Sequence, residues 1–285
     1  MRLRHAADDA NRVEDSAAAA LRASPAAVPW VADLPLVGRR GDLIALRRHL
    51  EAVSEGRGHC VLLAGEAGVG KSRLLAAFAQ EARQRKVLVA SGSAFAMEAG
   101  VPYGAVADAL AAPLRALDAS ALMVLARGAD DDLRAVVPGL ADGAGVRAPR
   151  AAPDPDGEAG SKVRLLWNVT QFLARLSVRQ PLLLLLDNAH ESDPSSLELL
   201  HFLVRQVAGS RILIVLAYVD DGHDANPALR NMVRSLLGTR EATLQRVGSL
   251  SASDLAELLQ RSFALPAADA ERHGAALYTN ANASV

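Results

Sequence analysis

One short motif constrains the fold of this chain more than any other feature. Residues 65–72 read GEAGVGKS and match the phosphate-binding loop pattern, G-x-x-x-x-G-K-[ST], at every fixed position. An apolar run, CVLLA, occupies residues 60–64, and residues 73–85 carry the apolar spacing of a helix. The order strand, glycine-rich loop, helix therefore predicts a phosphate-binding loop inside an α/β domain rather than a glycine-rich turn.

The residue types in this loop suit the binding of a nucleotide. We expect the glycines at its two ends to let the backbone fold into an anion-binding nest where a Cβ atom would clash. The lysine would place a compact positive charge on the β- and γ-phosphates, and the serine hydroxyl would be a ligand for Mg²⁺. The last residue, Arg73, is either a helix-surface residue or a nucleotide contact. The predicted binding residues of this segment are Gly65, Glu66, Ala67, Gly68, Val69, Gly70, Lys71, Ser72 and Arg73.

Strand and helix patterns alternate along most of the chain. Further strands are predicted at residues 87–90, 182–186, 212–219 and 242–247. Helices are predicted at residues 42–53, 102–117, 120–137, 161–178, 195–207, 227–237 and 251–263. This alternation predicts a mostly parallel five-stranded sheet flanked by helices, the P-loop NTPase class of α/β fold. We expect a flexible leader at 1–33, a nucleotide-binding domain at 34–249 with a mobile loop at 141–160, and a separate helical segment at 250–285.

Charge and cysteine content exclude several classes of protein. The formal net charge is −1, so no overall attraction to nucleic acid or to an anionic membrane is predicted. The single cysteine, Cys60, excludes an internal disulfide and a cysteine-rich zinc site, and suits a reducing cytosol. The N-terminal residues hold no apolar signal segment, and the apolar run at 212–219 is too short to cross a bilayer. We therefore expect a cytoplasmic protein without membrane contact.

A second candidate site residue follows the run of five leucines at 182–186. Asp187 ends this predicted strand, at the edge of a parallel sheet where ligands bind, and we expect it to hold Mg²⁺ together with Ser72. Its alternative role is that of a turn residue or helix cap. The next residue, Asn188, cannot act as a base, so Glu191 is the candidate for orienting a water molecule. The predicted catalytic residues are Lys71, Asp187 and Glu191.

Several segments together resemble one family. The chain resembles the ATPase module of STAND-type AAA regulators, as found in large bacterial LuxR-type transcriptional regulators, over residues 34–285. The P-loop is the most specific of the segments, and the others gain weight from their order. These segments are LVGRRGDLIALRRHL, HCVLLAGEAGVGKSRLLAAFA, VPYGAVADAL, LLLLLDNAHESDPSSLELLHFLV and RILIVLAYVDD.

The resemblance implies a switch operated by ATP or ADP with Mg²⁺. A helical lid, here only its first part at 250–285, would close over ADP, and ATP would favour an open state that self-associates. Val37, Gly38 and Arg39 match the segment that packs near the adenine in this family. Sensor and DNA-binding output domains would follow in relatives and are expected to be absent from this chain. Direct nucleic-acid binding by this segment is not predicted.

Four positions depart from the family pattern. Arg40 stands where the family has a glutamate, and Asn188 stands where it has a second acid. Glu191 replaces a tryptophan, and Val219 replaces an arginine that senses the γ-phosphate. The loss of the second acid and of that arginine predicts weak or slow hydrolysis in a nucleotide-binding switch module of a signalling or transcriptional regulator. The alternatives are an active ATPase, such as an AAA-like motor or loader, and a degenerate nucleotide-binding scaffold for protein interaction.

Overall fold

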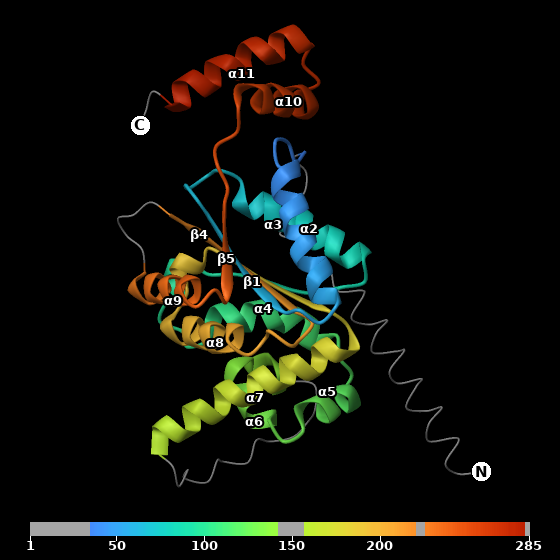
Figure 1. The fold of residues 1–285 in the computed structure, drawn as a ribbon, viewed down its shortest axis with the longest axis vertical. Coiled ribbons are helices and arrows are strands. Elements are labelled where there is room, and N and C mark those ends of the chain that lie inside the picture. Colours follow the sequence, from blue (N-terminus) through green and yellow to red (C-terminus); the bar gives the residue numbers. More distant parts are fainter. Residues whose placement is uncertain (1–34, 142–156, 221–225, 283–285) are drawn as a thin grey trace, which may run out of the picture.

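The computed structural model describes residues 35–141, 157–220 and 226–282. Within these residues, five strands form a single parallel sheet in the order β2-β3-β4-β1-β5 (Figure 1). This arrangement confirms the predicted P-loop NTPase class, a parallel five-stranded sheet flanked by helices. The strands are β1 (His59–Gly65), β2 (Leu88–Ser93), β3 (Leu182–Asp187), β4 (Ile212–Val219) and β5 (Ala242–Arg246).

Helices cover both faces of the sheet. The first two described helices pack on one face, and the helices that follow β2, β3 and β4 form the layer on the other face (Figure 1). The first layer consists of α2 (Arg40–Ser54) and α3 (Lys71–Gln84). The second layer consists of α4 (Gly104–Arg115), α7 (Gly157–Arg179), α8 (Pro194–Val204) and α9 (Pro227–Gly238). The short helices α5 (Ala119–Ala126) and α6 (Asp130–Val136) pack against α7 (Figure 1). Single 3-10 turns are η1 (Ala96–Glu98), η2 (Pro138–Ala141) and η3 (Ala189–Glu191).

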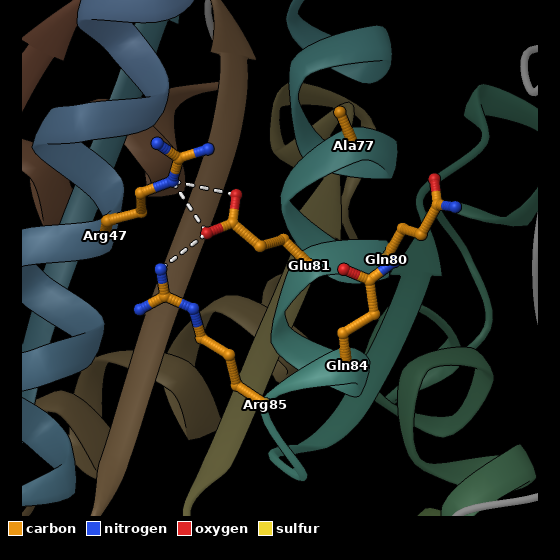
Figure 2. A pocket seen from close by; sticks show the side chains of 6 residues that line it. All are labelled: Arg47, Ala77, Gln80, Glu81, Gln84 and Arg85. Carbon is orange, nitrogen blue, oxygen red and sulfur yellow. Dashed lines mark hydrogen bonds and ion pairs between the residues drawn. The ribbon is translucent and has the colours of Figure 1, made fainter.

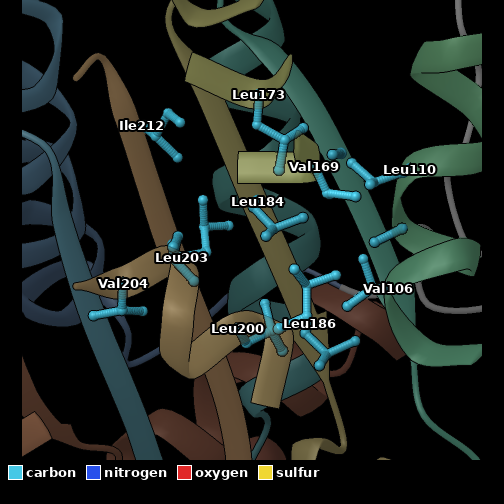
Figure 3. Packing of buried hydrophobic residues seen from close by; sticks show 14 of the residues in the cluster. Val106, Leu110, Val169, Leu173, Leu184, Leu186, Leu200, Leu203, Val204 and Ile212 are labelled. Carbon is cyan, nitrogen blue, oxygen red and sulfur yellow. The ribbon is translucent and has the colours of Figure 1, made fainter. Parts of the chain in front are cut away.

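The five leucines of β3 show why this sheet needs two helical layers. Leu184 and its even-numbered neighbours face the core beneath α4, α7 and α8, while Leu183 and Leu185 face the core beneath α2 and α3. Successive side chains of a strand point to opposite faces, so a run of apolar residues must be covered on both. Figure 3 shows Leu184 packed among side chains of these helices, including Leu110 and Leu173.

The structure differs from the predicted helices in two places. The helix predicted at 120–137 is divided into α5 and α6, because Arg127 and Gly128 adopt positive φ angles of 46° and 86° between them. A left-handed pair ends a helix, which explains the division. The helix α7 begins at Gly157, so the end of the loop predicted at 141–160 is helical. The rest of that loop, at 142–156, and the leader predicted at 1–33 lie outside the described residues.

A helical hairpin follows β5. The helices α10 (Ala252–Phe263) and α11 (Ala267–Asn282) pack against each other, set apart from the sheet in Figure 1. The first begins with a capping box, in which Ser251 and Asp254 exchange side-chain and backbone hydrogen bonds. Close packing depends on Gly274, where an added Cβ would lie 2.8 Å from the backbone nitrogen of Ala256. None of the helices in the described parts of the chain is long and apolar enough to span a membrane.

Candidate functional site

The glycine-rich loop joins the end of β1 to the start of α3. Gly68 and Gly70 adopt φ angles of +78° and +97°, which L side chains rarely adopt. At Gly65 the constraint is space, because an added Cβ would lie 2.5 Å from the carbonyl oxygen of Val247. The prediction that a Cβ would clash is therefore right for Gly65 and wrong for Gly70, where no described atom lies within 4 Å. Gly70 is needed for its backbone angle.

The lysine of the motif is the first residue of α3 and is buried. Lys71 is 6% exposed, and its Nζ donates hydrogen bonds to the carbonyl oxygens of Gly65, at 2.8 Å, and Glu66, at 2.7 Å. Burial lowers the pKa of Lys71, while the negative charge of Asp187 opposes this change. The ammonium group is therefore folded against its own loop, in a position from which it can exchange carbonyl oxygens for phosphate oxygens.

The rest of the loop faces solvent. Glu66, Ala67 and Gly68 are exposed, Val69 and Gly70 are half-buried, and the helix that follows presents its N-terminus at the same place. Ser72 is exposed in the first turn of α3, and Arg73 beside it is half-buried. Backbone N–H groups at a helix N-terminus favour anions, so this opening can accept a phosphate chain.

Asp187 lies at the carboxyl end of β3, which is separated from β1 by β4. Its Oδ1 accepts a hydrogen bond from the Asn188 backbone at 2.9 Å, and its carbonyl oxygen accepts one from the Ala94 backbone at 3.0 Å. Asn188 adopts a left-handed φ of 51°, which asparagine tolerates better than most residues. The negative charge of Asp187 raises the pKa of Lys71 against the effect of burial, so these two predicted site residues interact electrostatically.

The donor set fits magnesium better than a metal that requires a protein cage. Across the described ranges, no three histidine, cysteine or acidic side chains gather as a metal site. Mg²⁺ usually keeps several water molecules and takes one or two protein oxygens along with substrate phosphates. A serine hydroxyl in the first turn of α3 and a carboxylate at the end of β3 are the oxygens expected for such an ion.

Glu191 belongs to the turn η3, which packs against β4. Its Oε1 lies 3.7 Å from Nε2 of His190, and it is 39% exposed. The other ring nitrogen of His190, Nδ1, accepts a hydrogen bond from the Val219 backbone at 3.5 Å. Val219 ends β4 opposite Gly65 in the register of the sheet. These contacts of His190 were not predicted, although its position between Asn188 and Glu191 was a signal.

The segment before α2 contacts the loop directly. Val37 is buried, and Gly38 has a φ of +66°. Arg39 is 6% exposed, and its Nη2 donates to the carbonyl oxygens of Val69, at 2.5 Å, and Gly248, at 2.7 Å. These contacts exclude a surface role for Arg39. The predicted position of Arg39 near the adenine does not include these contacts with loop and linker carbonyls.

An open pocket lies elsewhere, between the outer faces of α2 and α3 (Figure 2). Its charged residues are engaged with one another, since Nε of Arg47 donates to both carboxylate oxygens of Glu81, at 2.7 and 2.8 Å. Arg85 lies 2.8 Å from the same carboxylate. Arg47 comes from the middle of α2, and the other lining residues come from the middle of α3 and its C-terminal end. The loop opens at the start of α3, so the pocket is not part of the candidate site.

Comparisons with known proteins identify one family and several similar structures. The model of the AAA ATPase domain family matches residues 35–216. The Orc1 protein of Aeropyrum pernix, solved in complex with DNA, is similar over 85% of this chain and 52% of its own, with 19% identity and a TM-score of 0.44. A STAND protein with a tetratricopeptide repeat sensor from Pyrococcus horikoshii is similar over 88% of this chain and 28% of its own, with 14% identity and a TM-score of 0.41.

A third similar structure is the AMPPCP-bound DnaA of Aquifex aeolicus, with 16% identity and a TM-score of 0.37, over 80% of this chain and 52% of that protein. The chain thus spans about half of the Orc1 and DnaA chains and less of the STAND protein. The comparison with curated proteins gave no match. Because the family model covers more than half of the sequence, this chain belongs to the AAA ATPase domain family.

Proposed function

We propose that this chain is an ATP/ADP-binding switch module of a bacterial signalling or transcriptional regulator, and that it hydrolyses ATP slowly. The observation that carries the proposal is the backbone conformation of the loop together with the position of its lysine. Gly68 and Gly70 hold left-handed angles, and Lys71 lies buried against carbonyls of the loop within the electrostatic reach of Asp187. A nucleotide would take the place of the loop carbonyls as the partner of this ammonium group.

The loop, the predicted magnesium ligands and the segment before α2 have separate parts in this proposal. The loop backbone and Lys71 would bind the phosphates, and Ser72 and Asp187 would hold Mg²⁺. The ion would supply positive charge that neutralises the phosphate oxygens. The segment Val37–Arg39 would flank the base, with Val37 as its buried apolar residue.

Slow hydrolysis follows from the groups beside Asp187 and at the end of β4. Asn188 offers no base, and Val219 offers no charge for the γ-phosphate. A side chain that orients the attacking water must then come from Glu191 or from another subunit. Without one, bound ATP persists, which is the property that a switch needs.

A single-turnover assay with labelled Mg·ATP tests the proposal. It follows bound nucleotide and released phosphate in the same sample, with Lys71→Met as the test variant and Lys162→Met as the matched control, because Lys162 is an exposed lysine paired with Glu198. We expect the wild type and the control to bind ATP and keep most of it intact, and Lys71→Met to lose binding. Absence of ATP and ADP binding by the folded wild type would overturn the proposal in favour of a degenerate scaffold.

An active ATPase is the second candidate, and the contact between His190 and Glu191 favours it. This pair would hold a carboxylate beside the end of β4, near the place where a water molecule would attack. If phosphate release is fast and depends on Lys71, Glu191→Gln should slow it at least tenfold while leaving ATP affinity within about twofold. Rapid release that is unchanged by Glu191→Gln would point to a residue from a neighbouring subunit.

The same proposal extends to assembly. Residues 250–285 would form the first part of a lid over the nucleotide, and the ATP-bound state would self-associate. The hairpin of α10 and α11 supports this view, since it is joined to the sheet by a short linker after β5. Light scattering of the protein with ADP and with a non-hydrolysable ATP analogue tests it: a larger particle only with the analogue is expected, and equal masses would contradict it.

A further inference from the structure

The side chain of Arg39 connects three parts of the chain that are distant in sequence. Its Nη2 donates to the carbonyl oxygen of Val69 in the P-loop and to that of Gly248 in the linker after β5. Its Nη1 lies 3.6 Å from the carboxylate of Asp42 in the first turn of α2. With 6% of its surface exposed, this charged side chain gains little from water and depends on these partners.

The bond to Val69 affects the part of the loop that would bind phosphate. In a planar trans peptide the carbonyl oxygen and the N–H group point in opposite directions, so holding the Val69 oxygen also sets the direction of the Gly70 N–H. Gly70 has a φ of +97°, and a glycine can rotate its flanking peptides more easily than other residues can. An external hydrogen bond that fixes this peptide therefore prepares the loop for an anion.

The bond to Gly248 acts on the other side, close to the helical hairpin. Gly248 lies three residues before Ser251, the N-cap of α10. The chain beside Arg39 also touches this helix, because a Cβ added to Gly38 would lie 2.6 Å from Cγ of Asp254 in the capping box. The segment before α2 thus contacts both the linker and the first turn of α10.

We infer that Arg39 is a positioning residue that couples occupancy of the P-loop to the order of the linker at 247–251 and of α10. The inference rests on the proposed nucleotide binding. A phosphate that accepts from the Gly70 N–H and a guanidinium that donates to the Val69 oxygen polarise the same peptide, so each bond strengthens the other. By linkage, whatever fixes the linker also favours the nucleotide.

Binding measurements separate this role from a contact with the base. We compare ATP with tripolyphosphate, which has no base, in the wild type, Arg39→Met, Arg39→Lys and the control Arg48→Met, an exposed arginine on α2. Arg39→Met should weaken both ligands by the same factor, about tenfold, because the loss of charge-assisted hydrogen bonds acts through the loop. Arg39→Lys should lie between, and Arg48→Met should match the wild type. A loss for ATP without a loss for tripolyphosphate would overturn the inference.

Hydrogen exchange measures the coupling itself. In the wild type, ATP should slow amide exchange in peptides covering residues 247–256, and in Arg39→Met, at ATP concentrations that saturate the variant, it should not. Arg39→Lys provides the same comparison if the methionine variant does not fold. Equal ATP-dependent protection in the wild type and the variant would refute the coupling.

Failure of the proposed function would give a different result. If the wild type binds neither ATP nor ADP, the nucleotide switch is excluded. The connection between the P-loop and the linker through Arg39 is then tested by hydrogen exchange without nucleotide. There, Arg39→Met should speed exchange both in the P-loop at 68–74 and in the linker at 247–256, whereas Arg48→Met should not. Unchanged exchange in either segment would then remove Arg39 as a connection between them.

Discussion

Replacing Gly65 with alanine tests whether close contact between two backbones shapes the start of the P-loop. The added Cβ would lie 2.5 Å from the carbonyl oxygen of Val247 and 3.1 Å from a methyl group of Val69, while ordinary contact begins at 3.4 Å. The two backbones must therefore separate by 3.4 − 2.5, or about 0.9 Å. The Val247 N–H donates to the Ala64 carbonyl at 2.8 Å, and this movement would stretch that bond between the ends of β1 and β5.

The expected cost combines overpacking with a weakened hydrogen bond. Overpacking of a filled site costs about 1–3 kcal/mol, and one hydrogen bond contributes about 1 kcal/mol, so Gly65→Ala should lower the free energy of unfolding by about 2–4 kcal/mol. Urea unfolding followed by circular dichroism measures this change as a shift in midpoint at constant slope. A movement of Gly65 should also weaken ATP binding.

The matched control is Gly41→Ala, in the first turn of α2. No atom of the described residues lies within 4 Å of a Cβ at this position, and alanine is the better helix former, so the control should stabilise the protein by up to about 1 kcal/mol. The two alanines should thus have opposite effects. A Gly65→Ala protein as stable as the wild type would show that the chain after β5 can move away from Gly65 without loss of stability. The close approach of Val247 would then not explain the glycine at this position.

Three further predictions concern the core and the surface of the sheet domain. Leu184→Ala removes a side chain that is 1% exposed and should cost about 2–5 kcal/mol in urea unfolding, so a loss below 1 kcal/mol would contradict the packing in Figure 3. Glu81→Gln removes the carboxylate shared by the arginines in Figure 2 and should cost about 1 kcal/mol or less, with a smaller effect in 1 M salt. His49 and His59 stack with ring centroids 4.9 Å apart, and burial lowers the pKa of both rings, with the charge of His49 lowering that of His59 further. Below about pH 6.5 the two histidines of the unfolded chain bind protons, whereas those of the folded protein stay neutral to a lower pH. The free energy of unfolding should therefore be highest above about pH 6.5 and fall as the pH drops below it. Replacing both histidines with glutamine should flatten this part of the pH profile, and an unchanged slope would exclude them as its cause.

The elements that could be predicted from the sequence are those whose signal is local. The five leucines of β3 indicate a strand covered on two faces. Residues 65–72 indicate a phosphate-binding loop, because the spacing of the glycines, lysine and serine lies within one short segment. The division between α5 and α6 was not predicted, because arginine is an ordinary helix former and Arg127 nevertheless adopts a left-handed φ of 46° at the end of α5. Periodicity in the apolar residues continues across this break, so it cannot report it.

The contacts that complete the candidate site join residues that are distant in sequence. Arg39 lies 209 positions from Gly248, and no spacing rule reaches across that distance. In the sequence, the position of Arg39 before an amphipathic helix is equally compatible with an exposed and with a buried side chain. The side chain is buried because the linker after β5 packs beside it. For the same reason, the motif predicts the residues that would contact phosphate but not the residues that hold the loop in place. The first follow from the chemistry of the ligand, whereas the second depend on which carbonyl groups the fold places beside the loop. A substitution at Arg39 should therefore change nucleotide binding without altering any residue of the motif.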